Sequence, residues 1–154
     1  MTTDDIFDMV KKLREKTEIP LVFMTYLNPV FHYGYEAFFE RCQDVGIDGI
    51  IIPDLPFEEK EEVDVVASRY GIDLISMIAP TSKERIRKIA KGAKGFLYVV
   101  SSMGVTGERT NITTDIGGML KEIRSVSSVP AAVGFGIHTP DQAAEISKTA
   151  DGVI

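Results

Sequence analysis

The sequence contains one cysteine and two histidines in 154 residues, and both scarcities limit its chemistry. The single cysteine, Cys42, excludes a disulfide within the chain and fits a reducing compartment, so we expect a cytoplasmic protein. Cys42 falls on the apolar face of a predicted helix, which favours a place in the core over a role as nucleophile. His32 and His138 are far apart and have no cysteine or glutamate pattern beside them, so we predict no metal site.

Basic residues and long apolar runs are also scarce. The 17 Lys and Arg residues are outnumbered by 23 Asp and Glu, which gives a net charge of -6. Nucleic-acid binding needs clustered cations, so we expect no nucleic-acid partner. No apolar run approaches the ~20 residues that cross a bilayer, and the polar start at 2–5 is unlike a signal peptide. We therefore expect no membrane partner.

Short apolar runs alternate with amphipathic segments along the whole chain. We predict strands at 21–24, 49–52, 74–78, 96–100, 131–133 and 152–154. We predict helices that start at Thr2 or Thr3, at 35–45, 58–70, 82–91 and 115–124, and after Thr139. Nearly continuous apolar strands separated by helices are typical of parallel sheets that are covered on both faces.

Two of the predicted strands run into loops that contain glycine. Segment 95–107 reads Gly-Phe-Leu-Tyr-Val-Val-Ser-Ser-Met-Gly-Val-Thr-Gly, and the strand at 131–133 continues into Gly134, Phe135 and Gly136. Glycine lets backbone N–H groups approach an anion with no Cβ in the way. Ligands of parallel α/β folds gather at the carboxyl ends of strands, so we predict a phosphate site shared by these two loops.

Six predicted strands are fewer than the eight of a (β/α)₈ barrel, which typically has ~250 residues. The last run, 152–154, is short for a strand, and the first predicted helix has no strand before it. We predict an α/β fold, a partial (β/α)₈ TIM barrel of about six strands, in one domain over 1–154 without an internal boundary. An open doubly wound sheet tolerates six strands and remains the alternative.

Four segments resemble the tryptophan synthase alpha chain family. They read Met-Thr-Tyr-Leu-Asn-Pro-Val-Phe at 24–31, Ile-Pro-Asp-Leu-Pro at 52–56, Tyr-Val-Val-Ser-Ser-Met-Gly-Val-Thr-Gly at 98–107 and Val-Gly-Phe-Gly-Ile at 133–137. The resemblance extends over essentially the whole chain. It implies a TIM-barrel lyase of tryptophan biosynthesis that cleaves indole-3-glycerol phosphate to indole and glyceraldehyde 3-phosphate by a retro-aldol route. It also implies no cofactor on this chain, and a beta-chain partner that carries pyridoxal phosphate.

The resemblance assigns roles to individual residues. It implies supporting catalytic roles for Tyr98 and Thr106. It implies substrate-binding roles for Tyr26, Gly107, Gly134, Phe135 and Gly136. It places the contact with the beta chain at Asn28, Asp54, Pro56 and Phe57. The residues themselves allow plainer interpretations, with Tyr98 as a core aromatic, Asp54 as a turn acceptor and 134–136 as a tight turn. Arg109 could be a phosphate clamp or a solvated charge.

Two parts of the family pattern do not occur in these 154 residues. They are the general acid/base glutamate on the second strand and the loop Gly-[Val/Ile]-Pro-[Phe/Tyr]-Ser-Asp-Pro that carries the catalytic aspartate. The chain resembles strands three to eight, so we expect a fragment that is inactive alone, because general acid–base assistance is worth ~10²–10⁴-fold.

Three further expectations stay open. The chain could be a non-catalytic piece that docks on a beta chain, since the catalytic segment is not in it. It could belong to another phosphate-binding TIM-barrel enzyme, for which Asp54 is the candidate carboxylate. Unpaired sheet edges would also make a six-strand piece prone to self-association.

Overall fold

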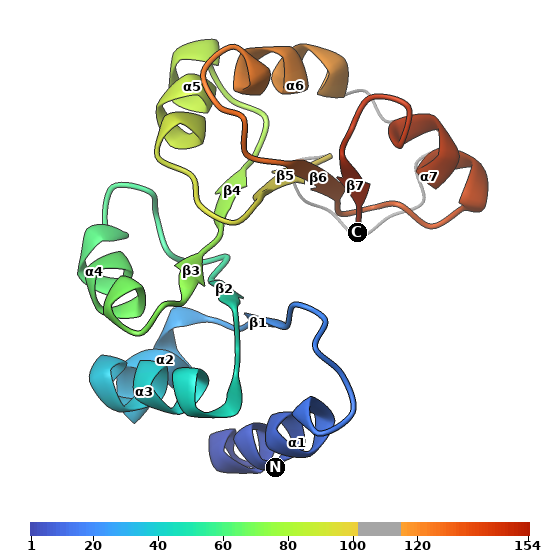
Figure 1. Cartoon of the computed structure of the whole chain (residues 1–154). Coiled ribbons are helices and arrows are strands. Elements are labelled where there is room, and N and C mark those ends of the chain that lie inside the picture. The colour runs from blue at the N-terminus through green and yellow to red at the C-terminus, as the bar shows by residue number, and fades with distance from the viewer. Residues whose placement is uncertain (102–114) are drawn as a thin grey trace. The chain divides into compact units, whose positions relative to one another are not determined.

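Helices alternate with parallel strands along most of residues 1–101 and 115–154, which the computed structural model describes (Figure 1). The chain forms two compact units, residues 1–75 and 76–154, and each is described by itself. All strand pairs in the described ranges are parallel, as the alternation of apolar runs and helices predicted. The single domain that we expected over 1–154 stays a prediction.

The first unit holds a three-stranded sheet in the order β1-β2-β3. Its elements are α1 (Thr3–Arg14), β1 (Val22–Met24), α2 (Leu27–Tyr33), α3 (Tyr35–Val45), β2 (Gly49–Ile51), α4 (Glu61–Arg69) and β3 (Asp73–Leu74). Val22 pairs with Gly49, and Gly49 pairs in turn with Asp73. Helix α1 begins as predicted, because the Thr2 hydroxyl accepts the Asp5 N–H and the Asp5 carboxylate accepts the Thr2 N–H.

Aromatic rings form the centre of the first unit's core. The Phe7 ring of α1 lies 5.8 Å from Phe23 of β1 and 5.4 Å from Phe38 of α3, centroid to centroid. Tyr33 of α2 meets Phe7 edge-on at 5.7 Å. Phe7 and Phe39, which meets Phe38 edge-on at 5.4 Å, are fully buried, and each such ring contributes about 1.5–3 kcal/mol through burial. This cluster ties α1, α2 and α3 to one face of β1.

The second unit holds a four-stranded sheet in the order β4-β5-β6-β7. Its elements are β4 (Ser76–Ile78), α5 (Lys83–Lys91), β5 (Leu97–Val100), α6 (Ile116–Arg124), β6 (Ala131–Gly134), α7 (Pro140–Ile146) and β7 (Gly152–Val153). Ser82, Asp115 and Thr139 cap α5, α6 and α7 through their side-chain oxygens. The predicted helix starts in this half of the chain are therefore confirmed to within a residue.

Three predicted elements differ from the structure. Residues 27–33 form helix α2, where no helix was predicted between the strand at 21–24 and the helix at 35–45. Pro29 is tolerated because it is the third helical residue, where a backbone N–H has no acceptor within the helix. The predicted strand at 74–78 divides into β3 and β4 at Ile75, whose N–H donates to the Ile50 carbonyl oxygen at 2.9 Å. Helix α4 begins at Glu61, later than predicted.

An arginine–aspartate clamp joins a helix end to two strand starts in the first unit. Arg14, the last residue of α1, donates from Nε to the Gly46 carbonyl at 2.8 Å and from Nη2 to Asp48 at 2.6 Å. Asp48 accepts the Leu21 N–H at 2.7 Å, and its own N–H donates to the Leu21 carbonyl at 2.9 Å. The clamp fixes the starts of β1 and β2 relative to α1.

The second unit repeats this clamp with different residues. Arg124, the last residue of α6, donates to the Thr149 carbonyl at 2.7 Å and to Asp151 at 3.4 Å. Asp151 accepts the Ala131 N–H at 2.9 Å and donates its own N–H to the Ala131 carbonyl at 3.0 Å. The starts of β6 and β7 are held in the same way as those of β1 and β2.

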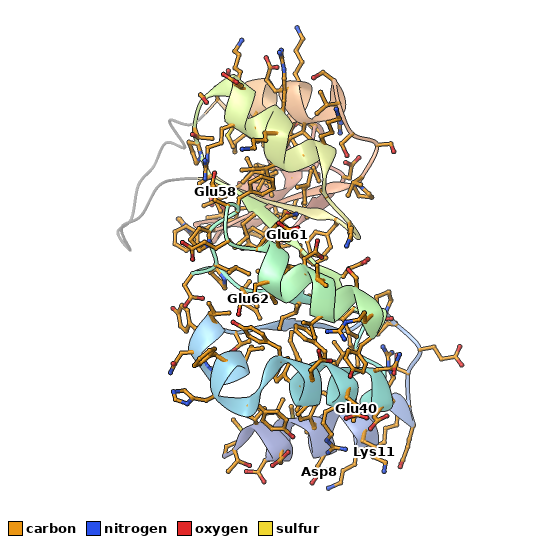
Figure 2. The ribbon with its side chains drawn as sticks, turned by 90° about the vertical axis from the view of Figure 1, so that its left-hand side faces the viewer. Asp8, Lys11, Glu40, Glu58, Glu61 and Glu62 are labelled. Atoms are coloured by element: carbon orange, nitrogen blue, oxygen red, sulfur yellow. The ribbon has the colours of Figure 1, made fainter. Side chains whose placement is uncertain are left out.

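Charged side chains cover the outer faces of the first unit's helices. Figure 2 shows Asp8 and Lys11 on α1, Glu40 on α3, and Glu61 and Glu62 on α4. Acidic residues in the first turn of α4 suit the positive end of the helix dipole. Among the described residues, no three His, Cys, Asp or Glu side chains lie together as metal ligands. No helix in those ranges combines the length and apolar character needed to cross a membrane.

Replacing Arg14 should destabilise the fold through loss of the first clamp. We expect Arg14→Met to lower the free energy of unfolding by about 1–2 kcal/mol, because it leaves the Gly46 carbonyl and Asp48 without a charged donor. Arg69→Met is the matched control, since Arg69 pairs with Glu36 on an exposed surface and such pairs contribute about 0–1 kcal/mol. Urea unfolding of both variants measures the difference, and equal losses would contradict the clamp.

Cys42 should be inert while the chain is folded. Burial raises the pKa of its thiol to about 12, so almost no thiolate exists at pH 8. We expect Ellman's reagent to react about 100-fold more slowly with the folded chain than with the chain in guanidinium. The unfolded thiol loses its proton near pH ~8.5, so this group also reduces stability as the pH rises from there toward 12. Rapid labelling of the folded chain would place Cys42 at the surface.

Candidate functional site

The carboxyl ends of β5 and β6 lie side by side in the second unit. Val100 is paired with Gly134, the last residue of β6. The N–H of Ser101 extends the pairing beyond β5 and donates to the Gly134 carbonyl at 2.9 Å. The carboxyl ends of β5 and β6 therefore lie next to each other. This confirms the predicted juxtaposition of the Tyr98 strand and the Gly134–Gly136 segment.

Tyr98 and Gly134 are in direct contact. Tyr98 lies on β5 and is only 6% exposed. A Cβ atom added to Gly134 would lie 2.5 Å from Tyr98 Oη and 2.7 Å from Tyr98 Cζ, closer than van der Waals contact allows. The ring of Tyr98 thus occupies the space that any other side chain at 134 would need. The sequence indicates that Gly134 allows an anion to approach, and the structure adds this packing reason.

The backbone turns sharply immediately after β6. Phe135 has φ 76°, the one positive φ outside glycine in the described residues, and Gly136 has φ 82°. A left-handed conformation costs a residue with a Cβ roughly 1–2 kcal/mol. The Phe135 side chain is 49% exposed, so burial of its ring offsets little of this cost. The turn is strained at a strand end, which is where binding sites of parallel α/β folds occur.

A buried hydroxyl holds this turn in place. Ser101, 1% exposed, donates from Oγ to the carbonyl oxygen of Phe135. Further along the turn, the Gln142 side-chain oxygen accepts the N–H groups of His138 and Thr139 at 3.0 and 3.3 Å. The N–H of Gly136 donates to no group among the described residues. This N–H is therefore a candidate donor to a bound anion.

The predicted residues of the first unit meet at the start of α2. Asp54, in the loop after β2, accepts the N–H of Leu27 at 2.9 Å and so caps α2 from outside the helix. Tyr26 at the N-cap position makes no capping bond with its own side chain and is 66% exposed. Asn28 on α2 is also exposed. The bond joins the end of β1 to the loop after β2.

The remaining predicted residues fall into two groups. Pro56 is exposed, and Phe57 is half-buried with the Lys60 ammonium 4.9 Å from its ring centroid. Thr106, Gly107 and Arg109 lie outside the described residues. Tyr26 and the Asp54 loop belong to the first unit, whereas Tyr98 and 134–136 belong to the second.

Sequence reasoning gave no role to Ser101 or to Glu122. Ser101 stands within the quoted motif at 98–107, and its place directly after an apolar strand was the available signal. Glu122 on α6 is 9% exposed and accepts Arg87 Nε at 2.7 Å, with Lys83 Nζ at 3.3 Å. The hydrogen bond from Arg87 lowers the pKa of the Glu122 carboxyl. Glu122 is thus the centre of an ion-pair cluster between α5 and α6.

These features define an α/β protein whose parallel strands β5 and β6 end side by side in a strained, glycine-containing turn. The family profile described as "Tryptophan synthase alpha chain" matches residues 1–154. The chain is 53% identical to the tryptophan synthase alpha chain of Lacticaseibacillus casei over 152 residues, which is 99% of this chain and 57% of that protein. It therefore belongs to the tryptophan synthase alpha chain family, a lyase family with the TIM-barrel fold.

Solved structures of the family agree with this placement. The alpha subunit from Campylobacter jejuni matches all of this chain and 62% of its own, with a TM-score of 0.88 and 39% identity. A tryptophan synthase α₂β₂ complex from Pyrococcus furiosus matches 99% of this chain and 62% of its own, with a TM-score of 0.87 and 32% identity. The match favours the barrel over the doubly wound sheet. The chain spans about 57% of the length of the curated relatives that it matches.

The contact between Tyr98 and Gly134 predicts strong coupling between the two positions. Gly134→Ala should destabilise the chain by about 1–3 kcal/mol, because its Cβ overlaps the Tyr98 phenol. Adding Tyr98→Leu removes the overlapping atoms and should recover most of that loss. Gly92→Ala is the control, since no atom lies within 4 Å of the added Cβ. Urea unfolding of the four-member cycle measures the coupling, and additive losses would contradict the contact.

Proposed function

We propose that these 154 residues form the part of a tryptophan synthase alpha subunit that binds the phosphate of indole-3-glycerol phosphate. The observation that carries the proposal is the turn after β6, where the Gly136 N–H has no acceptor among the described residues and lies beside the end of β5. Two neighbouring strand ends with glycine let main-chain amides surround an anion. The family membership supplies the substrate class.

The chain's own residues would bind and orient the substrate for retro-aldol cleavage. Tyr98 would line the pocket from β5, and the half-exposed ring of Phe135 would contact the indole. The substrate-binding role of Tyr26 stays a prediction. Thr106 and Gly107 would act from their loop, Thr106 toward a catalytic carboxylate and Gly107 toward the phosphate. The proton transfers need carboxylates of the family's second strand and following loop, so we propose that the 154 residues alone do not turn over substrate.

A beta chain is the proposed protein partner. The Pyrococcus furiosus relative is an α₂β₂ complex, and we propose that the rim around Asn28, Asp54, Pro56 and Phe57 meets such a partner here. Tyr26 and Phe31 are 66% and 61% exposed at the start and middle of α2, and exposed aromatic residues favour an interface. Any pyridoxal phosphate would belong to the beta chain, and the complex would be cytoplasmic.

The same exposed rim favours a second candidate function. The chain could dock on a beta chain without catalysis, since the exposed aromatics of α2 need no substrate to bind a partner. Binding of a beta chain without restored turnover would support this alternative. Self-association through sheet edges stays a separate prediction, to be checked by light scattering.

Replacing Gly136 with alanine should weaken phosphate binding. We expect Gly136→Ala to weaken binding of glycerol 3-phosphate about tenfold or more, because a Cβ atom is strained at φ 82° and would shift the turn that presents the Gly136 N–H. Gly71→Ala is the matched control, since Gly71 also has a positive φ and an open Cβ position but lies far from β6 in the sequence. Isothermal titration measures the affinity of each variant, and equal affinities for the two would contradict the site.

We expect turnover of indole-3-glycerol phosphate only when a second piece supplies the catalytic carboxylates. Mixing the chain with an amino-terminal piece of the Lacticaseibacillus casei alpha chain should restore indole release from indole-3-glycerol phosphate. The chain alone should show none. Activity of the chain alone would overturn the proposed dependence on those carboxylates, whereas beta-chain binding without recovered turnover would favour the docking function.

A further inference from the structure

Ser101 connects the end of β5 to the turn after β6 by two hydrogen bonds. Its N–H donates to the Gly134 carbonyl at 2.9 Å, and its Oγ donates to the Phe135 carbonyl. The residue is 1% exposed, so its hydroxyl has no competing water. Two successive carbonyls of the β6 end are therefore directed toward one buried residue.

The second bond determines the direction of the Gly136 N–H. In a trans peptide the C=O and the following N–H point to opposite sides of the chain. No cis peptide bond occurs in the described residues. When the Phe135 carbonyl is held toward Ser101 Oγ, the Gly136 N–H must point away from Ser101. A freely rotating peptide at this position would present the N–H in that direction only part of the time.

The bond also accounts for the strained backbone. Phe135 keeps φ 76° although it is not glycine, and Gly136 follows with φ 82°. A hydrogen bond from a buried hydroxyl to this carbonyl offsets part of the strain of a left-handed residue. Removing the hydroxyl would free the peptide to relax toward an ordinary conformation.

We propose that Ser101 is a positioning residue for anion binding, which holds the Phe135–Gly136 peptide so that its N–H faces the ligand. The inference rests on the proposed phosphate site and deepens it. Ser101 does not touch the ligand in this arrangement, and it acts through the Phe135 carbonyl. Without the Ser101 hydroxyl, the Gly136 N–H is no longer held in one orientation. Binding then carries the entropic cost of ordering this N–H, which reduces affinity for the phosphate group.

The test compares Ser101→Ala with Ser76→Ala in the 154-residue chain. Ser76 is also a buried serine of the second unit, but its hydroxyl has no hydrogen-bond partner among the described residues, so its loss serves as the matched control. Ser101→Thr keeps a hydroxyl, and Ser101→Cys keeps similar volume with a weaker donor in case the alanine variant does not fold. Titration with glycerol 3-phosphate gives each affinity, and the ¹⁵N amide signal of Gly136 reports the turn directly.

We expect Ser101→Ala to bind glycerol 3-phosphate at least about tenfold more weakly, Ser101→Cys to lie between it and wild type, and Ser76→Ala and Ser101→Thr to stay within about twofold of wild type. The Gly136 amide signal should shift in Ser101→Ala without ligand. Wild-type affinity in Ser101→Ala overturns the inference and leaves the phosphate site intact, as does a loss confined to urea stability. No binding by the wild-type chain overturns the phosphate site and this inference together.

Discussion

The parallel pairing of β5 with β6 is the constraint on which the candidate site depends. Val100 lies opposite Gly134, and this register brings Ser101 to the Phe135 carbonyl and the Tyr98 ring to the Gly134 Cα. A shift of one residue would turn Tyr98 to the other face of the sheet. The strands are short, so their pairing alone leaves few hydrogen bonds to resist such a shift.

Contacts at the opposite ends of the strands supply the missing restraint. The Leu97 N–H donates to the Pro130 carbonyl at 2.8 Å at the start of the β5–β6 pair. The Arg124–Asp151 clamp then fixes Ala131, the first residue of β6. Arg14 and Asp48 fix the starts of β1 and β2 in the same way, so an arginine–aspartate clamp occurs in both units. These contacts stabilise the amino ends of the strands, which leaves the carboxyl end of β6 free to carry a strained turn.

Helices were predictable from the sequence where a local signal marks both ends. Helix α3 spans Tyr35–Val45 as predicted, because Gly46 adopts a left-handed conformation that ends it. Helix α2 was missed because its cap comes from Asp54, which is 27 residues away from Leu27 and gives no local signal. The division of 74–78 was missed for a related reason, since Ile75 bonds to Ile50 while Ser76 pairs with Leu97. Long-range partners decide both features.

The sequence predicted the glycine positions of the candidate site, but not the contact at Gly134 or the backbone conformation of Phe135. Glycine at 134 and 136 indicated a close approach of the backbone, but the sequence could not show that Tyr98 is what approaches Gly134. Phe135 is the informative exception. Glycine at that position would adopt φ 76° without strain, and the half-exposed ring adds little to the core. Local stability therefore does not explain the phenylalanine, and the indole contact proposed for its ring does.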